Sequence, residues 1–277
     1  MRRVVPLRIV SRSPPPVIIR PDITAAPALS KAASLLSGPR GVSGSRLTRC
    51  PRSSCTWPTY SGDYTGKRYS TLKQINQLNV KNLTLAWATR VTAGMGQGGG
   101  GRFGGPSFPT IVGGEGPTDA GPGTNIRASV LQVDGVLYFS TPDNAWAVDA
   151  RDGSVLWHYV WKTKGGTHIG NRGMAMWKNW LYMETPDDYL VCLDAKTGKE
   201  RWHKVIASFD EQYFSTMAPI VVGNHLLVGT GNDMDAPGFL QSFDPDTGEV
   251  QWKWYAVPMK KGDPGLETWA SLDAARH

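Results

Sequence analysis

One eleven-residue phrase occurs three times in the chain: AVDARDGSVLW at 147–157, CLDAKTGKERW at 192–202 and SFDPDTGEVQW at 242–252. In each copy an Asp is followed by a Gly four residues later and by a Trp four residues after that. The Asp residues repeat at intervals of 45 and 50 residues. A repeat of this period is the sequence signature of an array of similar supersecondary units.

Each copy has the local chemistry of a hairpin. The Asp bonds its own backbone and the Gly supplies a positive φ, so the centre of the phrase predicts a turn between two strands. A further strand and turn precede each copy, at 133–141, 178–185 and 223–230. One unit is therefore a run of short antiparallel strands, which is typical of a β-propeller blade. We interpret the recurring Trp as a side chain that docks between neighbouring blades.

The charge of the chain excludes one class of function. The 277 residues carry a formal net charge of +7, but the basic excess lies in the first 52 residues. The remainder is slightly acidic, so global charge does not indicate a nucleic-acid-binding surface. No apolar run is long enough for a transmembrane segment. The three Cys residues and five His residues show no metal-site spacing, and Cys192 is expected to be a small buried side chain.

The first 56 residues differ from the rest. They are rich in Arg, Ser and Pro and contain no aromatic residue. We interpret residues 1–56 as a basic disordered tail or a non-native start, with an organellar transit peptide as the alternative. The folded unit is expected over 57–277.

The segment between the tail and the repeats predicts little regular structure. A turn at 61–63, a short helical piece over 71–79 and a strand that carries Trp87 and ends near Val91 are expected. Such a strand would complete the last blade of a closed ring. The Gly-rich stretch 94–123 predicts a long loop. Its match to G-x-G-x-x-G has no flanking strand and helix, so it does not indicate a dinucleotide site.

The repeats, the opening DYTGKRYSTLKQINQLNVKNLTLAW at 63–87 and the N-R-G at 171–173 together resemble the quinoprotein alcohol dehydrogenases of the methanol and ethanol dehydrogenase type. The resemblance covers 57–277. It implies an eight-bladed propeller with pyrroloquinoline quinone and a calcium or lanthanide ion on its axis. It also implies an alcohol or sugar substrate, an electron acceptor such as a cytochrome c, and a periplasmic location. We therefore expect an all-β partial propeller of about three four-stranded blades plus an orphan strand.

The resemblance also implies site residues. Arg172, with Asn171 beside it, matches an arginine that contacts the quinone, and a guanidinium can fork onto its acidic groups. Thr216 matches a quinone-bonding threonine, and Arg127 stands where the family has a quinone-bonding Glu. Asp233 and Asp235 lie where the family places a carboxylate that ligates the metal, which suits a hard cation.

Two departures weaken the family pattern. Gly166-Thr167 stands where the family often has adjacent cysteines over the quinone. The family's stacking Trp, metal-binding Asn and catalytic Asp belong to segments beyond residue 277, so no catalytic residue is assigned and the chain is expected to be inactive alone. A non-enzymatic scaffold of the same repeat type, like the propeller of outer-membrane protein assembly, remains the alternative.

Structural alternatives accompany these assignments. Arg172 could be a buried arginine that pairs with an Asp between blades, and Asp233 and Asp235 could be plain loop acids. His168 is expected to have a polar role near the axis. The pair Asp187-Asp188 predicts a solvated hairpin turn. Three further aromatic residues are expected to pack at blade edges: Trp161, Trp177 and Trp180.

Overall fold

The computed structural model describes residues 56–70, 72–91, 94, 108–117, 126–166, 170–231 and 236–276. The tail up to residue 55 and most of the Gly-rich stretch lie outside the described residues. So do Thr167, His168, Asp233 and Asp235, so that the structure does not test what was predicted for them.

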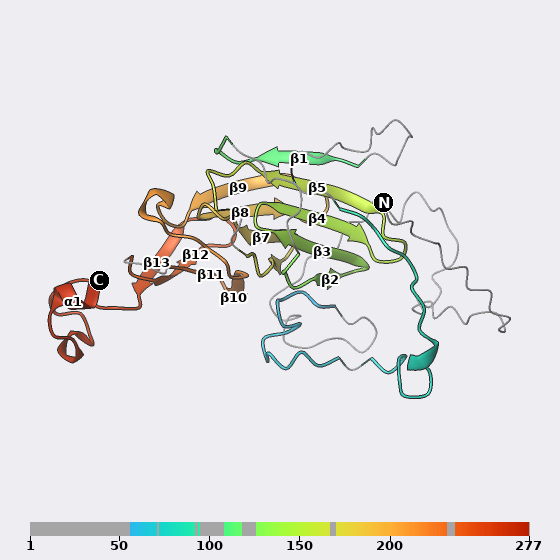
Figure 1. The fold of residues 1–277 in the computed structure, drawn as a ribbon, viewed down its shortest axis with the longest axis horizontal. Helices are drawn as coiled ribbons and strands as arrows, with labels where there is room; N and C mark the ends of the chain where they lie inside the picture. The colour runs from blue at the N-terminus through green and yellow to red at the C-terminus, as the bar shows by residue number, and fades with distance from the viewer. Residues whose placement is uncertain are drawn as a thin grey trace, which may run out of the picture.

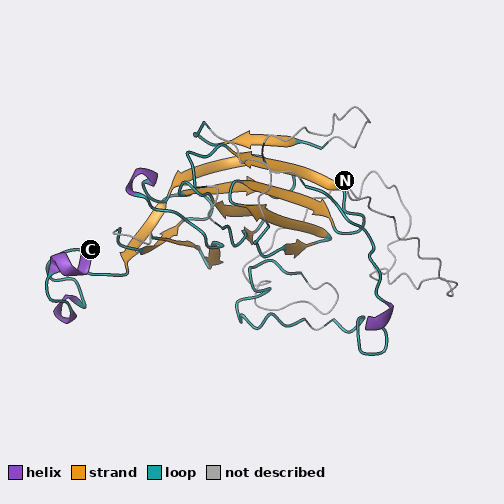
Figure 2. Cartoon of the chain, in the orientation of Figure 1, coloured by secondary structure: helices purple, strands orange, loops and turns teal. Residues whose placement is uncertain are grey.

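Three sheets stand side by side, and each contains a four-stranded antiparallel meander (Figure 1, Figure 2). Blade 1 contains β2 (Leu131–Val133), β3 (Val136–Thr141), β4 (Asn144–Asp149) and β5 (Val155–Trp161). Blade 2 contains β6 (Ala175–Trp177), β7 (Trp180–Glu184), β8 (Tyr189–Asp194) and β9 (Glu200–Val205). Blade 3 contains β10 (Ile220–Val222), β11 (His225–Thr230), β12 (Phe239–Phe243) and β13 (Val250–Tyr255). The predicted all-β partial propeller of three four-stranded blades is confirmed.

The repeated phrase forms the same turn in every blade. The Gly N–H donates to the carbonyl of the Asp four residues earlier at 2.8–2.9 Å, and φ of Gly153, Gly198 and Gly248 is +69° to +78°. Just before each Asp the register shifts by one residue, which is a β-bulge at the same place in all three blades. The shared turn and bulge give the three units one backbone geometry.

The Trp that ends each of the first two phrases joins its blade to the next one, whereas Trp252 of the third phrase is exposed and covers no turn of a described blade. The Trp157 indole N–H donates to the carbonyl of Ala195 at 3.0 Å, and its ring lies over Gly198 of blade 2. The Trp202 indole N–H donates to the carbonyl of Asp246, one position further along the turn, at 3.3 Å, and its ring lies over Gly248 of blade 3. The predicted docking of these Trp residues between blades is therefore confirmed by geometry.

Trp87 makes this contact without a strand. Its indole N–H donates to the carbonyl of Ala150 at 3.0 Å, and its ring covers Gly153 of blade 1. Residues 83–91 have no strand partner, so the strand predicted there is wrong, although Trp87 sits as a last-strand Trp would. The helical piece predicted over 71–79 is wrong as well: the described residues 72–79 form bends and turns, and the 3₁₀ turn η1 (Val80–Asn82) follows them.

Two apolar clusters fill the seams between blades. The first is shared by blades 1 and 2 and contains the fully buried Trp157 and Trp161. The second is shared by blades 2 and 3 and contains Cys192, whose expected burial is confirmed. Because side chains from two sheets meet in each cluster, neighbouring blades share each core. Trp177 and Trp180 are only half-buried at this second cluster, whereas Trp161 is fully buried.

The remaining elements are short. They comprise η2 (Phe209–Glu211) after β9, and η3 (Leu266–Thr268) and α1 (Leu272–Arg276) after β13. Figure 1 shows α1 well away from the three blades. None of the described helices is long and apolar enough to cross a membrane.

Strand β1 (Thr110–Gly113) corrects the prediction of a loop over 94–123. It pairs in parallel with β5 and adds a fifth strand to the first sheet. The next residues stay on the blade, because the N–H of Gly116 donates to the carbonyl of Lys162 at 2.9 Å. A Cβ on Gly116 would stand 2.0 Å from the backbone of Thr163, so only glycine fits so close an approach.

Glu115 ties this segment to blade 2. It accepts hydrogen bonds from the Tyr189 hydroxyl at 2.8 Å and from His203 at 3.2 Å, and His203 also contacts Glu200 at 2.6 Å. Burial lowers the pKa of His203, but the bonds to Glu200 and Glu115 outweigh burial and raise it above 6.5. The bond from Tyr189 lowers the pKa of Glu115. The Glu115–His203 contact is therefore ionic between these two pKa values.

We expect Glu115→Gln to lower the pKa of His203, because one of its two carboxylate partners becomes neutral. The stabilisation from His203 is complete below its unfolded pKa of about 6.5 and is lost as the pH rises through its higher folded pKa. A titration of the imidazole ring protons by NMR measures the change. Glu249→Gln, which removes a carboxylate paired with Lys204, is the control. An unchanged His203 midpoint in Glu115→Gln would refute the contact.

Candidate functional site

The innermost strands of the three blades start next to one another. The N–H of Ser129 donates to the carbonyl of Arg172 at 2.9 Å, and the N–H of Arg172 donates to the carbonyl of Thr216 at 3.0 Å. Ser129 also bridges in parallel to Gly173. The structure thus brings together the segments that hold Arg127, Asn171-Arg172 and Thr216, which are far apart in the sequence.

Asn171 is buried, and both the oxygen and the nitrogen of its side-chain amide form hydrogen bonds. Its Oδ1 accepts from the Ser140 hydroxyl at 2.7 Å and from the N–H of Gly173 at 2.8 Å, and its Nδ2 donates to the carbonyl of Glu184 at 3.1 Å. The side chain therefore fixes the loop that carries Arg172. A bulkier residue at 173 would meet strain, since φ of Gly173 is +127°.

Arg172 itself is exposed, and its guanidinium has no hydrogen bond or ion pair to another described residue. The alternative that it is buried and pairs with an Asp between blades is therefore wrong. Arg127 is also exposed, and its side chain lies against Gly170, 3.6 Å from where a Cβ would stand. Two exposed cationic side chains thus stand near the start of the inner strands.

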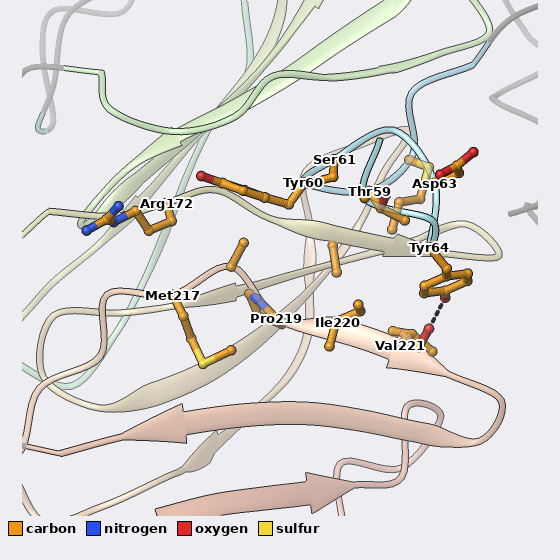
Figure 3. A pocket seen from close by; sticks show the side chains of 14 residues that line it. Thr59, Tyr60, Ser61, Asp63, Tyr64, Arg172, Met217, Pro219, Ile220 and Val221 are labelled. Atoms are coloured by element: carbon orange, nitrogen blue, oxygen red, sulfur yellow. Dashed lines mark hydrogen bonds between the residues drawn. The ribbon is translucent and has the colours of Figure 1, made fainter. Parts of the chain in front are cut away.

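A cavity of about 380 Å³ begins beside Arg172 and runs along β6 and β10. Met176, Met217, Pro219 and Val221 contribute to its apolar wall. Figure 3 shows Tyr60 on the opposite side, with its hydroxyl pointing toward Arg172. A flat ligand with acidic groups matches such a slot, because its ring would contact apolar side chains while its acid met the guanidinium.

The second wall of the cavity is the segment 57–66. Trp57 exchanges two backbone hydrogen bonds with Gln132 of β2, and the Ser129 hydroxyl donates to the carbonyl of Tyr60 at 2.7 Å. The Tyr64 hydroxyl donates to the carbonyl of Val221 (Figure 3). The sequence analysis did not identify Tyr60 or Tyr64 as site residues. The only signal was that the segment WPTYSGDY is rich in aromatic residues.

Metal ligands are not apparent in the part of the chain that the structure describes. There, no group of three or more His, Cys, Asp or Glu side chains is arranged to hold an ion. The metal ligands predicted from the family, Asp233 and Asp235, lie outside the described residues.

Comparison with known proteins adds a consistent result. The family model for the glucose/ethanol/alcohol dehydrogenase β-propeller domain (PQQ) matches residues 57–276. A quinohemoprotein alcohol dehydrogenase of Comamonas testosteroni is 33% identical over 222 residues, which are 75% of this chain and 26% of that protein. The crystal structure of the quinohemoprotein alcohol dehydrogenase from Comamonas testosteroni matches with a TM-score of 0.61 at 29% identity, over 80% of this chain and 30% of that chain. A europium-containing methanol dehydrogenase matches with a TM-score of 0.55 at 26% identity, over 73% of this chain and 32% of that one. The chain thus spans only about a quarter to a third of the length of these relatives.

Proposed function

We propose, because this chain belongs to the family of glucose/ethanol/alcohol dehydrogenase β-propeller domains, that it forms part of the wall of a pyrroloquinoline quinone site in an alcohol dehydrogenase. The observation that carries the proposal is the position of Arg172. It is exposed, has no partner among the described residues and lies at one end of a mostly apolar cavity.

The chemistry of the cofactor fits this arrangement. Pyrroloquinoline quinone is a flat ring system with carboxylates, and it supplies a quinone that accepts two electrons from an alcohol. Arg172 would bind an acidic group, and Arg127 stands close enough to the same loop to support it. Thr216 would add a hydroxyl from the start of blade 3. Asn171 would act indirectly, since its amide already holds the loop.

The finer assignments are part of the same proposal. A calcium or lanthanide ion would be held in part by Asp233 and Asp235. The substrate would be an alcohol or a sugar, the electron acceptor a cytochrome c, and the location the periplasm. We assign no general base to this chain, so we expect binding of the quinone without turnover. The non-enzymatic scaffold is less favoured, because the matched family consists of dehydrogenase domains.

We expect Arg172→Ala to weaken binding of pyrroloquinoline quinone by about 10- to 100-fold, because a hydrogen bond to a charged group contributes about 1.5–3 kcal/mol. The measurement is a titration of the chain with quinone in the presence of calcium, followed by absorbance after gel filtration. Arg276→Ala removes the same charge from α1, far along the chain, and serves as the matched control.

Two results would count against the proposal. If Arg172→Ala bound quinone as the unchanged chain does, the assignment of the site would be wrong. If the unchanged chain retained no quinone after gel filtration, the cofactor proposal would fail and the scaffold would be favoured.

A further inference from the structure

Three acidic side chains lie buried at one end of blade 2. Glu184 ends β7, and Asp187 and Asp188 form the turn before β8; their exposed fractions are 1%, 0% and 0%. The solvated turn predicted for Asp187-Asp188 is therefore wrong, because the neighbouring segments of blades 1 and 3 cover it. Among the described residues, none of the three carboxylates has an ion-pair partner.

Asp187 is satisfied by hydrogen bonds. It accepts from the indole N–H of Trp161 at 2.8 Å, from the backbone N–H of Lys164 at 2.9 Å and from the Thr185 hydroxyl at 2.7 Å. Three donors are enough to stabilise a buried carboxylate. Asp187 thus has a structural role that joins blades 1 and 2.

Glu184 and Asp188 are not satisfied in this way. Both carboxylate oxygens of Glu184 and the Oδ2 of Asp188 have no hydrogen-bond partner in the described part of the chain. The Oδ1 of Asp188 accepts from the Ser215 hydroxyl at 2.5 Å and contacts the Thr230 hydroxyl at 3.1 Å. Three carboxylate oxygens are therefore buried in the seam between blades 2 and 3 without a hydrogen-bond partner among the described residues.

Such open oxygens are costly. A buried charge is normally paired, bound to a metal or removed by protonation. Burial raises the pKa of Glu184 well above its ordinary value, with the Asp188 charge adding to this and Ser215 opposing it. Burial likewise raises the pKa of Asp188 to about 6, against the hydrogen bonds from Ser215 and Thr230. Both shifts follow from burial without a cationic partner, so either a proton or a bound cation neutralises the two carboxylates.

We propose that Glu184 and Asp188 hold a hard divalent cation of the calcium type in the seam between blades 2 and 3. Calcium binds carboxylate, hydroxyl and water oxygens and tolerates irregular geometry. Glu184 offers two oxygens, Asp188 offers one, and the Ser215 hydroxyl is the adjacent neutral oxygen. The +2 charge of the cation balances the charges of the two carboxylates.

The position of the ligands gives the ion a structural consequence. Glu184 and Asp188 belong to blade 2, whereas Ser215 precedes β10 and Thr230 ends β11 of blade 3. The ion therefore joins two blades at the end of the seam where Asn171 holds the carbonyl of Glu184. The site uses neither Arg172 nor the segment 232–235, so it does not depend on the function proposed above.

Terbium luminescence tests the site in the full chain. Tb³⁺ replaces calcium at oxygen sites, and Trp161, which bonds the adjacent Asp187, is placed to sensitise it. We expect saturable Tb³⁺ emission that calcium displaces. The double variant Glu184→Gln/Asp188→Asn should lose this emission by at least 10-fold, whereas Glu249→Gln, which removes an exposed carboxylate paired with Lys204, should retain it. Emission lost equally in Glu249→Gln, or unaffected by the double variant, would overturn the proposal.

A stability measurement distinguishes a bound calcium ion from a proton shared by Glu184 and Asp188. With the ion bound, calcium should raise the Tm of the unchanged chain at pH 8 and should not raise that of Glu184→Gln. In chelator, Glu184→Gln should be at least as stable as the unchanged chain, because an unpaired buried charge has been removed. If calcium left the Tm of the unchanged chain unaltered, a proton rather than a metal would neutralise the pair, and the proposal would be wrong.

Discussion

Trp157→Ala is expected to lower the free energy of unfolding by about 3–5 kcal/mol, the usual cost of removing a buried Trp. The ring is 1% exposed, lies over the turn of blade 2 and packs against Tyr138 with ring centroids 6.1 Å apart. Its loss opens the seam between blades 1 and 2 and leaves the carbonyl of Ala195 without its indole donor. Urea unfolding followed by circular dichroism measures the change.

Trp252 provides the matched control for this experiment. It stands at the same place in the third copy of the phrase, but it is 38% exposed and covers no turn of a described blade. Trp252→Ala should therefore cost less than about 1 kcal/mol, as exposed substitutions usually do. Equal losses at 157 and 252 would show that the Trp stabilises its own blade rather than the joint.

Gly198→Ala is expected to lower the free energy of unfolding by about 2–5 kcal/mol, from two separate causes. An L residue at φ +69° costs about 1–2 kcal/mol. The new Cβ would also stand 2.7 Å from two indole carbons of Trp157, and such overpacking costs about 1–3 kcal/mol. The same urea titration measures the total.

Gly223→Ala separates these two causes. Gly223 has a similar φ of +63°, but a Cβ there would meet nothing within 4 Å. Only the backbone cost of about 1–2 kcal/mol is expected. If Gly198→Ala were no worse than Gly223→Ala, the ring of Trp157 would have room to move, and the joint would be looser than the structure indicates.

The blades could be predicted from the sequence because their signals are local. The turn at each Asp-to-Gly phrase and the docking of Trp157 follow from residue type and spacing alone. The meeting point of the inner strands could also be predicted, since the resemblance placed Arg172 and Thr216 at one site. The structure confirms that these two residues are neighbours and leaves their roles as proposals.

The rest could not be predicted because it depends on contacts between distant segments. Strand β1 pairs with β5 through backbone atoms, and its glycine-rich surroundings show no alternation. Asp187-Asp188 has the composition of an exposed turn, and only the adjoining blades make it buried. Tyr60 reaches the cavity because Trp57 pairs with β2, a contact that no local pattern indicates.

The contact between a Trp and the turn of the following blade has a direction. One face of a blade presents the indole donor, and the other face presents the carbonyl and the glycine that receive it. The two faces are complementary but not alike, as in a heterologous subunit interface. Blades joined in this way can be added or exchanged only head to tail, and each exchange leaves the chemistry of the joint unchanged. Duplication of a single ancestral unit would therefore be enough to extend such an array, without any new interface having to evolve.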